Sequence, residues 1–92
     1  MTIYIDEPRF YQKSPLGPRK WCHMATDGDV EELHSMAKSL GLKRSWFQDG
    51  RMPHYDLVES KRVLAIKKGA IEVTGIELAR KCWLSLMEKG NG

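Results

Sequence analysis

The length of the chain is the strongest constraint on its fold. A chain of 92 residues can enclose one modest hydrophobic core, but it is too short for two independently folding domains. We therefore predict a single domain over residues 1–92. A core of this size leaves little room for a deep cleft inside one protomer. We expect a surface groove, or a pocket shared between the copies of a homo-oligomer.

Composition and cysteine usage indicate a folded protein of a reducing compartment. Hydrophobic residues make up 41% of the chain and charged residues 29%, which is ordinary for a globular protein and argues against disorder. No apolar run approaches the length that spans a membrane, and the first residues lack the pattern of a signal peptide. Cys22 and Cys82 are far apart in the sequence, which favours buried thiols over a disulfide framework. We expect a cytoplasmic protein that does not associate with membranes.

Four short segments predict strands. They are residues 2–6, 20–25, 44–48 and 70–73, and each is rich in β-branched, aromatic or other apolar side chains. Residues 7–19 contain three prolines and a glycine, so they predict an extended loop between the first two strands.

Helical periodicity and capping signals predict three helices. Asp27 or Asp29 can cap the first helix, and Gly41 ends it in the left-handed conformation. Its apolar face comprises Val30, Leu33, Met36, Ala37 and Leu40. The second helix is expected over residues 58–69, and a capping box beginning at Thr74 opens the third. The predicted core residues of the third helix are Ile76, Ala79, Trp83 and Leu86 or Met87. These elements predict an α+β fold: a small mixed β-sheet of about four short strands with three helices packed against it.

The start of the second helix is the most suggestive segment for binding. A helix N-terminus offers unpaired N–H groups and a partial positive charge, and Ser60, Lys61 and Arg62 add a hydroxyl and two cations there. Cations are unfavourable at that end of the helix dipole unless an anion lies beside them. Just upstream, aromatic rings could stack on a base, and Asp56 could accept a hydrogen bond from a base or ribose. The predicted phosphate- or nucleotide-binding residues are His54, Tyr55, Ser60, Lys61, Arg62, Arg44, Trp46 and His23. The alternative is a capped, solvated helix with Tyr55 in the core.

The distribution of charge also favours an anionic partner. Eight basic and eight acidic residues cancel over residues 1–56, whereas seven basic residues face four acidic ones over residues 57–92, so the whole net charge of +3 lies in the last third. A net charge of +3 is small for a protein that recognises DNA sequences, so nucleic acid is a less favoured partner than a small phosphate-bearing molecule. The same charges could equally be the solvated faces of two helices.

A metal site is not predicted. The possible ligands are Cys22, His23, His34 and His54. No Cys-x-x-Cys or His-x-x-x-His spacing groups them, and His34 flanks the apolar face of the first helix, where structural histidines are common. We therefore expect neither a metal nor another cofactor.

Catalytic motifs are weak. Glu59-Ser60-Lys61 matches the Glu-x-Lys core of some metal-dependent nucleases, but that architecture places the motif on a strand and here it opens a helix. The carboxylates of Asp6, Glu7 and Asp27 have no spacing that joins them to it. No glycine-rich phosphate loop, nucleophile elbow or serine or cysteine triad is present. We predict a binding protein rather than an enzyme, with a small metal-dependent nuclease or nucleic-acid-processing protein as the alternative.

Seven motifs in order resemble a small domain family of long-unassigned function that is abundant in bacteriophages and scattered in bacteria. They are Ile3-Tyr4-Ile5-Asp6, Trp21-Cys22-His23-Met24, Glu32-Leu33-His34-Ser35-Met36-Ala37, Arg44-Ser45-Trp46-Phe47-Gln48, His54-Tyr55-Asp56-Leu57, Ser60-Lys61-Arg62 and Gly69-Ala70-Ile71-Glu72. The resemblance covers about residues 2–74 and leaves the third helix outside. The chain departs from the family's pattern at Val58-Glu59, where Thr/Ser-Pro is expected, and this affects where the second helix starts.

The resemblance implies a phage origin and a role in the infected cell. In size and in its predicted anion site, the chain is also similar to phage sponges, oligomers that sequester the cyclic nucleotide signals of antiphage defence. On that resemblance, the protein would bind a cyclic nucleotide or dinucleotide in the host cytoplasm without turnover. A host-protein adaptor that uses exposed aromatic residues in 8–21 is a further alternative.

Overall fold

The computed structural model describes residues 2–84 and consists of a five-stranded sheet with helices on both faces. The strands are β1 (Ile3–Ile5), β2 (Arg9–Tyr11), β3 (Arg19–Thr26), β4 (Tyr55–Val58) and β5 (Ile71–Glu72). The helices are α1 (Val30–Ser39), α2 (Glu59–Lys67) and α3 (Gly75–Leu78), with a 3-10 turn, η1 (Arg44–Trp46), and a π-helical turn, η2 (Ala79–Trp83). The predicted α+β class with a small mixed sheet and three helices is confirmed.

β3 is the central strand, because every antiparallel pairing in the sheet involves it. β1 pairs with the second half of β3 and β2 with the first half. β4 pairs with residues 21–24 of β3. Trp21 and Met24 each face a partner on both sides, so β4 lies along the opposite edge of β3 from β1 and β2. β5 runs parallel to β1 and makes the sheet mixed.

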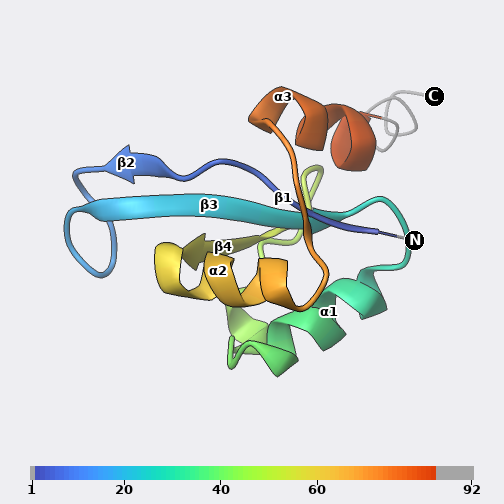
Figure 1. Ribbon diagram of the computed structural model, residues 1–92, viewed down its shortest axis with the longest axis horizontal. Helices are drawn as coiled ribbons and strands as arrows, with labels where there is room; N and C mark the ends of the chain where they lie inside the picture. Colours follow the sequence, from blue (N-terminus) through green and yellow to red (C-terminus); the bar gives the residue numbers. More distant parts are fainter. Residues whose placement is uncertain (1, 85–92) are drawn as a thin grey trace.

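The sheet separates two hydrophobic clusters. On one face, Cys22, Met24 and Leu57 pack with residues of α1 and α2. On the other face, Ala25 packs with Leu78 of α3 and with residues of η2. Successive residues of a strand point to opposite faces, which is why β3 contributes to both clusters. The result is a three-layer arrangement, with α1 and α2 below β3 and α3 above it in Figure 1.

Local signals at the helix ends act as expected. The Asp29 side chain caps α1 by accepting a hydrogen bond from the Glu31 N–H. Gly41 follows α1 with a φ of 80°, and the Leu42 N–H donates to the Ala37 carbonyl at 2.9 Å, so this end is the predicted glycine cap. Thr74 opens α3 with a complete capping box.

The strand prediction was wrong at three places. Residues 44–46 form the 3-10 turn η1 rather than a strand, and β2 and β4 were not predicted. The three residues of β2 are all exposed, so they carry no alternating apolar pattern, and their pairing with β3 depends on the hairpin. Tyr55 and Leu57 are buried while Asp56 and Val58 are partly exposed, so β4 does alternate, but over only four residues.

The predicted core face of the third helix is partly wrong. Trp83 is buried and Ala79 packs against the second cluster, but the Ile76 side chain is 67% exposed. Besides Trp83, the buried positions are Leu78 and Cys82, which were not predicted. A separation of two residues turns a helix by about 200°, so Ile76 points away from the sheet once Leu78 faces it. The other predicted core positions, Leu86 and Met87, lie outside the described residues.

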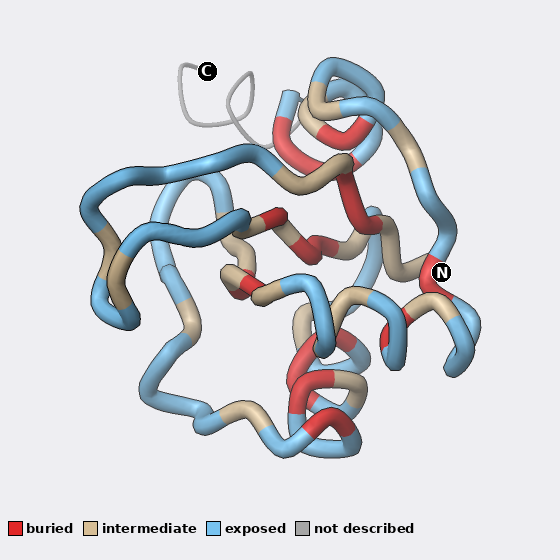
Figure 2. Tube along the Cα trace, turned by 60° about the vertical axis from the view of Figure 1, so that its left-hand side comes forward, coloured by how far each residue is buried: buried red, intermediate tan, exposed pale blue. Residues whose placement is uncertain are grey.

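Buried residues, red in Figure 2, concentrate on the inner strands and on the sheet-facing sides of the helices. The β2–β3 hairpin and residues 43–53 are largely exposed. Over residues 2–84, every helix falls short of the length and apolar character that crossing a membrane requires.

Candidate functional site

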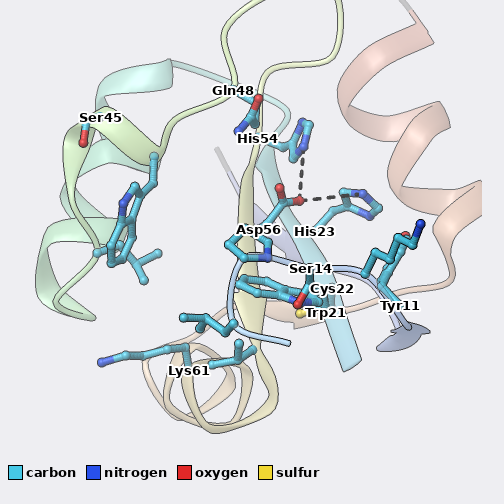
Figure 3. Close-up of a pocket in the computed structure, with 16 residues that line it drawn as sticks. Tyr11, Ser14, Trp21, Cys22, His23, Ser45, Gln48, His54, Asp56 and Lys61 are labelled. Atoms are coloured by element: carbon cyan, nitrogen blue, oxygen red, sulfur yellow. Dashed lines mark ion pairs between the residues drawn. The ribbon is translucent and has the colours of Figure 1, made fainter. Parts of the chain in front are cut away.

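A groove of about 770 Å³ lies over β3 and β4. The tip of the β2–β3 hairpin, residues 11–16, forms one wall, and η1 with Leu42 forms the other. Side chains of β3 and β4 form the floor, and Lys61 of α2 closes one side. Sequence segments that are far apart therefore build one concave surface (Figure 3).

Asp6 fixes the orientation of His23 on the floor of the groove. Asp6 follows β1 and is only 4% exposed. Its carboxylate accepts a hydrogen bond from the His23 backbone N–H at 2.6 Å and lies 2.8 Å from Nδ1 of the His23 ring. A carboxylate paired with Nδ1 keeps the proton on that nitrogen, so Nε2 is the nitrogen that His23 presents to the groove.

His54 is oriented in the same way by a carbonyl group. Its Nδ1 lies 2.6 Å from the Met52 carbonyl oxygen, which can only accept, so Nδ1 donates. Its Nε2 lies 3.3 Å from Oδ1 of Asp56, and Nε2 of His23 lies 3.9 Å from the same oxygen. Figure 3 shows the three side chains pointing toward one another.

His54 and Asp56 shift each other's pKa. Burial lowers the pKa of His54, but hydrogen bonds to the Asp56 carboxylate and the Met52 carbonyl outweigh burial, and the pKa is raised above its ordinary value. Burial raises the pKa of Asp56, but the hydrogen bond and charge of His54 and the charge of His23 outweigh it, and the pKa is lowered. Both shifts favour a His54–Asp56 ion pair.

Trp83 of η2 packs against both imidazoles. Its ring centroid lies 5.9 Å from that of His23 and 5.6 Å from that of His54, in edge-on geometry. The indole N–H donates to the Pro53 carbonyl at 3.1 Å, which holds the ring against the loop that carries His54. π-helical turns are frequent at functional sites, and this one aligns Trp83 with the two histidines.

The chemistry available at the floor is ligation or proton transfer rather than thiol chemistry. His23, His54 and Asp56 each offer a ligand atom, and these atoms all lie within 4.8 Å of one another. Two imidazoles and one carboxylate make a common ligand set for transition metals. The neighbouring Cys22 thiol donates to the Leu57 carbonyl at 3.5 Å. Burial raises the pKa of this thiol to about 12, so it is neither a thiolate ligand nor a nucleophile at neutral pH.

Four of the predicted binding residues line the groove, namely His23, His54, Trp46 and Lys61. Trp46 is 49% exposed on the η1 wall. The Lys61 ammonium donates to the Leu40 carbonyl at 2.8 Å and so also caps α1. Ligand contact by these four residues stays a prediction, but the structure places them on one surface.

The other four predicted residues lie elsewhere. Tyr55 is 1% exposed and its hydroxyl lies 2.8 Å from Nδ1 of His34, so it is a core residue and its ring is not available to stack on a base. Arg62 donates to the Asp6 carbonyl and to Glu72. Arg44 lines a second depression beside Tyr55, and Ser60 lies exposed in the first turn of α2.

The Glu59-Ser60-Lys61 motif of the nuclease alternative lies at the start of α2 rather than on a strand. Glu59 is exposed at the start of α2, and Lys61 turns toward α1. Asp27 accepts from the Thr2 N–H, and Asp6 pairs with His23.

The sequence pattern marks His23 and His54 as possible ligands but does not join them to Asp56 or Asp6. The available signal was His54-x-Asp56, because residues two apart on a strand share a face. That signal requires β4 to be recognised as a strand. Of the other proposed ligands, His34 lies in the core with Phe47 and Tyr55.

Comparison with curated proteins and with solved structures found no match. A family model described as "Protein of unknown function (DUF4031)" matches residues 3–84. This match includes α3 and η2, which the sequence resemblance had left outside. The groove, both histidines, Asp6, Asp56 and Trp83 all lie within the matched region, and the chain belongs to the DUF4031 family.

Proposed function

We propose that this protein binds a phosphate-bearing ligand of the nucleotide class in the groove over β3 and β4. The observation that carries the proposal is the combination of aromatic and cationic side chains on its walls. Tyr11 and Trp46 flank the floor, and Lys13 and Lys61 supply ammonium groups. Aromatic faces stack on bases of any identity, and ammonium groups pair with phosphate oxygens.

The size and openness of the groove agree with such a ligand. A volume of about 770 Å³ lies within the range of small-molecule sites, about 300–1,000 Å³. Its walls come from the exposed hairpin and η1 rather than from a deep core, as expected for a domain of 92 residues. A ligand would therefore be held against the surface, where a second copy of the chain could cover it.

The more specific form of the proposal is sequestration. A cyclic nucleotide or dinucleotide would be bound stoichiometrically, without turnover, by a homo-oligomer in the cytoplasm of a phage-infected cell. The resemblance to phage-borne domains and sponges supports this form. Cys22, the thiol nearest to the groove floor, is protonated and buried, which supports binding rather than covalent catalysis.

The test is a thermal-stability screen of the purified protein with mono-, di- and cyclic nucleotides in the presence of a chelator. Ligand at one hundred times its dissociation constant stabilises the folded state by about 2.7 kcal/mol. Trp46→Ala and Lys13→Ala should each weaken binding at least tenfold. The matched controls are Phe10→Ala and Lys20→Ala, because these neighbouring exposed side chains do not line the groove.

Two measurements decide the proposal: the stabilisation by nucleotides across the variants, and the state of the ligand after release. If no nucleotide stabilises the protein, or if the control variants weaken binding as much as the groove variants, nucleotide binding in this groove is rejected. Recovery of intact ligand after heat denaturation supports sequestration. Recovery of a cleaved product instead rejects sequestration and favours the nucleic-acid-processing alternative.

A further inference from the structure

We infer that His23, His54 and Asp56 form a binding site for one divalent transition-metal ion at the floor of the groove. The inference rests on the geometry of these side chains and is independent of the nucleotide proposal. Neither the sequence spacing nor the family match assigns a metal to this chain.

Hydrogen bonds at Nδ1 orient both imidazoles toward the proposed metal site. Nδ1 of His23 is engaged by the Asp6 carboxylate at 2.8 Å, and Nδ1 of His54 by the Met52 carbonyl at 2.6 Å. Metal-binding histidines characteristically donate their second N–H to a carboxylate or a backbone carbonyl, which fixes the tautomer and the ring orientation. Both rings therefore direct their other nitrogen, Nε2, toward the same carboxylate, and a metal ion would replace the proton that His54 shares with Asp56.

The distances between the ligand atoms are close to those around a bound metal ion. With metal–ligand bonds of about 2.0–2.1 Å, ligand atoms around one ion are separated by about 3–3.5 Å. The Asp56 Oδ1 lies 3.3 Å from Nε2 of His54 and 3.9 Å from Nε2 of His23. The two separations from Asp56 are within a few tenths of an ångström of this range, and all three ligand atoms lie within 4.8 Å of one another. Closing the set around one ion also requires the two imidazole nitrogens to approach each other, and the Asp56 side chain, 42% exposed, has room to move with them.

The surroundings supply rigidity and charge balance. Trp83 packs on both imidazoles from η2, so the rings cannot swing apart without displacing the indole. A divalent cation would pair with the Asp56 carboxylate in place of the proton that His54 shares with it. The two lysines that line the groove, Lys61 and Lys13, lie on its other walls.

The donor set determines the class of metal. Two imidazole nitrogens and one carboxylate suit Zn²⁺, Co²⁺, Ni²⁺ or Fe²⁺, whereas Mg²⁺ and Ca²⁺ prefer oxygen donors. Three protein ligands leave at least one coordination position open. Because His23, His54 and Asp56 all line the groove, that open position faces the groove.

The test is metal titration of untagged, chelator-treated protein. Co²⁺ is added while its visible absorption is followed, and Zn²⁺ binding is measured by calorimetry. We expect one ion per chain and a Co²⁺ spectrum that differs from that of the aqueous ion. His54→Ala and Asp56→Asn should each weaken Zn²⁺ binding by about 100-fold or more, and Asp6→Asn by about 10–100-fold through the orientation of His23. Asp49→Asn, an exposed carboxylate in the turn before β4, is the control and should not change the affinity.

The variants are compared only after circular dichroism in chelator shows that each is folded, and Asp56→Asn is the informative one if a histidine variant fails to fold. Unchanged Zn²⁺ affinity in Asp56→Asn, or equal losses in Asp49→Asn, overturns the inference, as does an aqueous-type Co²⁺ spectrum. No nucleotide is present in this experiment, and the nucleotide screen contains chelator. Failure of either proposal is therefore distinguishable from failure of the other.

Discussion

The Arg62 guanidinium connects three parts of the fold at the scale of a single residue. It donates to the Asp6 carbonyl at 2.9 Å and to Glu72 at 3.1 Å, and its side chain is 17% exposed. These bonds tie α2 to the end of β1 and to β5. Arg62 therefore also helps to position Asp6, whose carboxylate orients His23.

We predict that Arg62→Ala lowers the free energy of unfolding by about 1–3 kcal/mol, since a hydrogen-bonded charged group is lost and the Asp6 carbonyl loses its donor. Urea denaturation measures the change. Arg80→Ala removes the same charge from an exposed position and should change stability by less than about 0.5 kcal/mol. If Arg62→Ala left stability unchanged but abolished nucleotide binding, the role in phosphate binding expected from the sequence would be correct instead.

At the scale of the element, the packing of α3 determines which of its faces lies against the sheet. The Thr74 capping box sets where the helix begins, but it does not determine which side faces the sheet. Leu78 is completely buried beside Ala25, whereas Ile76 projects into solvent. The same helix then continues into η2, which places the Trp83 ring against the two histidines.

The matched substitutions Leu78→Ala and Ile76→Ala test this register. Leu78→Ala should cost about 2–5 kcal/mol through lost burial and a residual cavity, while Ile76→Ala should cost less than about 0.5 kcal/mol. Urea unfolding curves with equal slopes would give both values directly. Comparable losses at the two positions would show that Ile76 packs in the core and that the observed face is wrong.

At the scale of the whole molecule, the two cysteines report on the two sides of the sheet. Cys22 belongs to the cluster with α1 and α2, and Cys82 to the cluster with α3 and η2. Both thiols are buried, and burial raises the pKa of each to about 12. Neither thiol should react with a thiol reagent at pH 8 while its cluster is intact, because the thiolate is the reactive form.

A small single domain unfolds as one cooperative unit, so we predict that Cys22 and Cys82 become reactive together as urea is added. Mass spectrometry of the modified peptides gives a separate midpoint for each cysteine. A lower midpoint for Cys82 would mean that α3 and η2 detach before the main core unfolds. In that event the site would lose Trp83 while β3 and β4 remained folded.

The sequence by itself determined the elements that depend on neighbouring residues. The α1 helix, its Asp29 and Gly41 caps, the Thr74 capping box and the first and third strands follow from local hydrogen bonding and side-chain periodicity, which a short segment carries on its own. The α+β class follows from the same signals. The two histidines were also visible as candidate groups because their chemistry is a property of the side chain.

Only the tertiary structure decided the pairings and the site. β2 and β4 are strands because β3 offers them hydrogen-bonding partners, which no propensity within three or four residues can show. His23 and His54 converge on Asp56 because β3 and β4 pair in a register that places them on one face, while Asp6 and Trp83 arrive from β1 and η2. Side chains alternate along β4, so Tyr55 points into the core while its neighbours His54 and Asp56 face the site. These contacts join residues up to 60 positions apart (His23 to Trp83), and their geometry exists only once the sheet has formed.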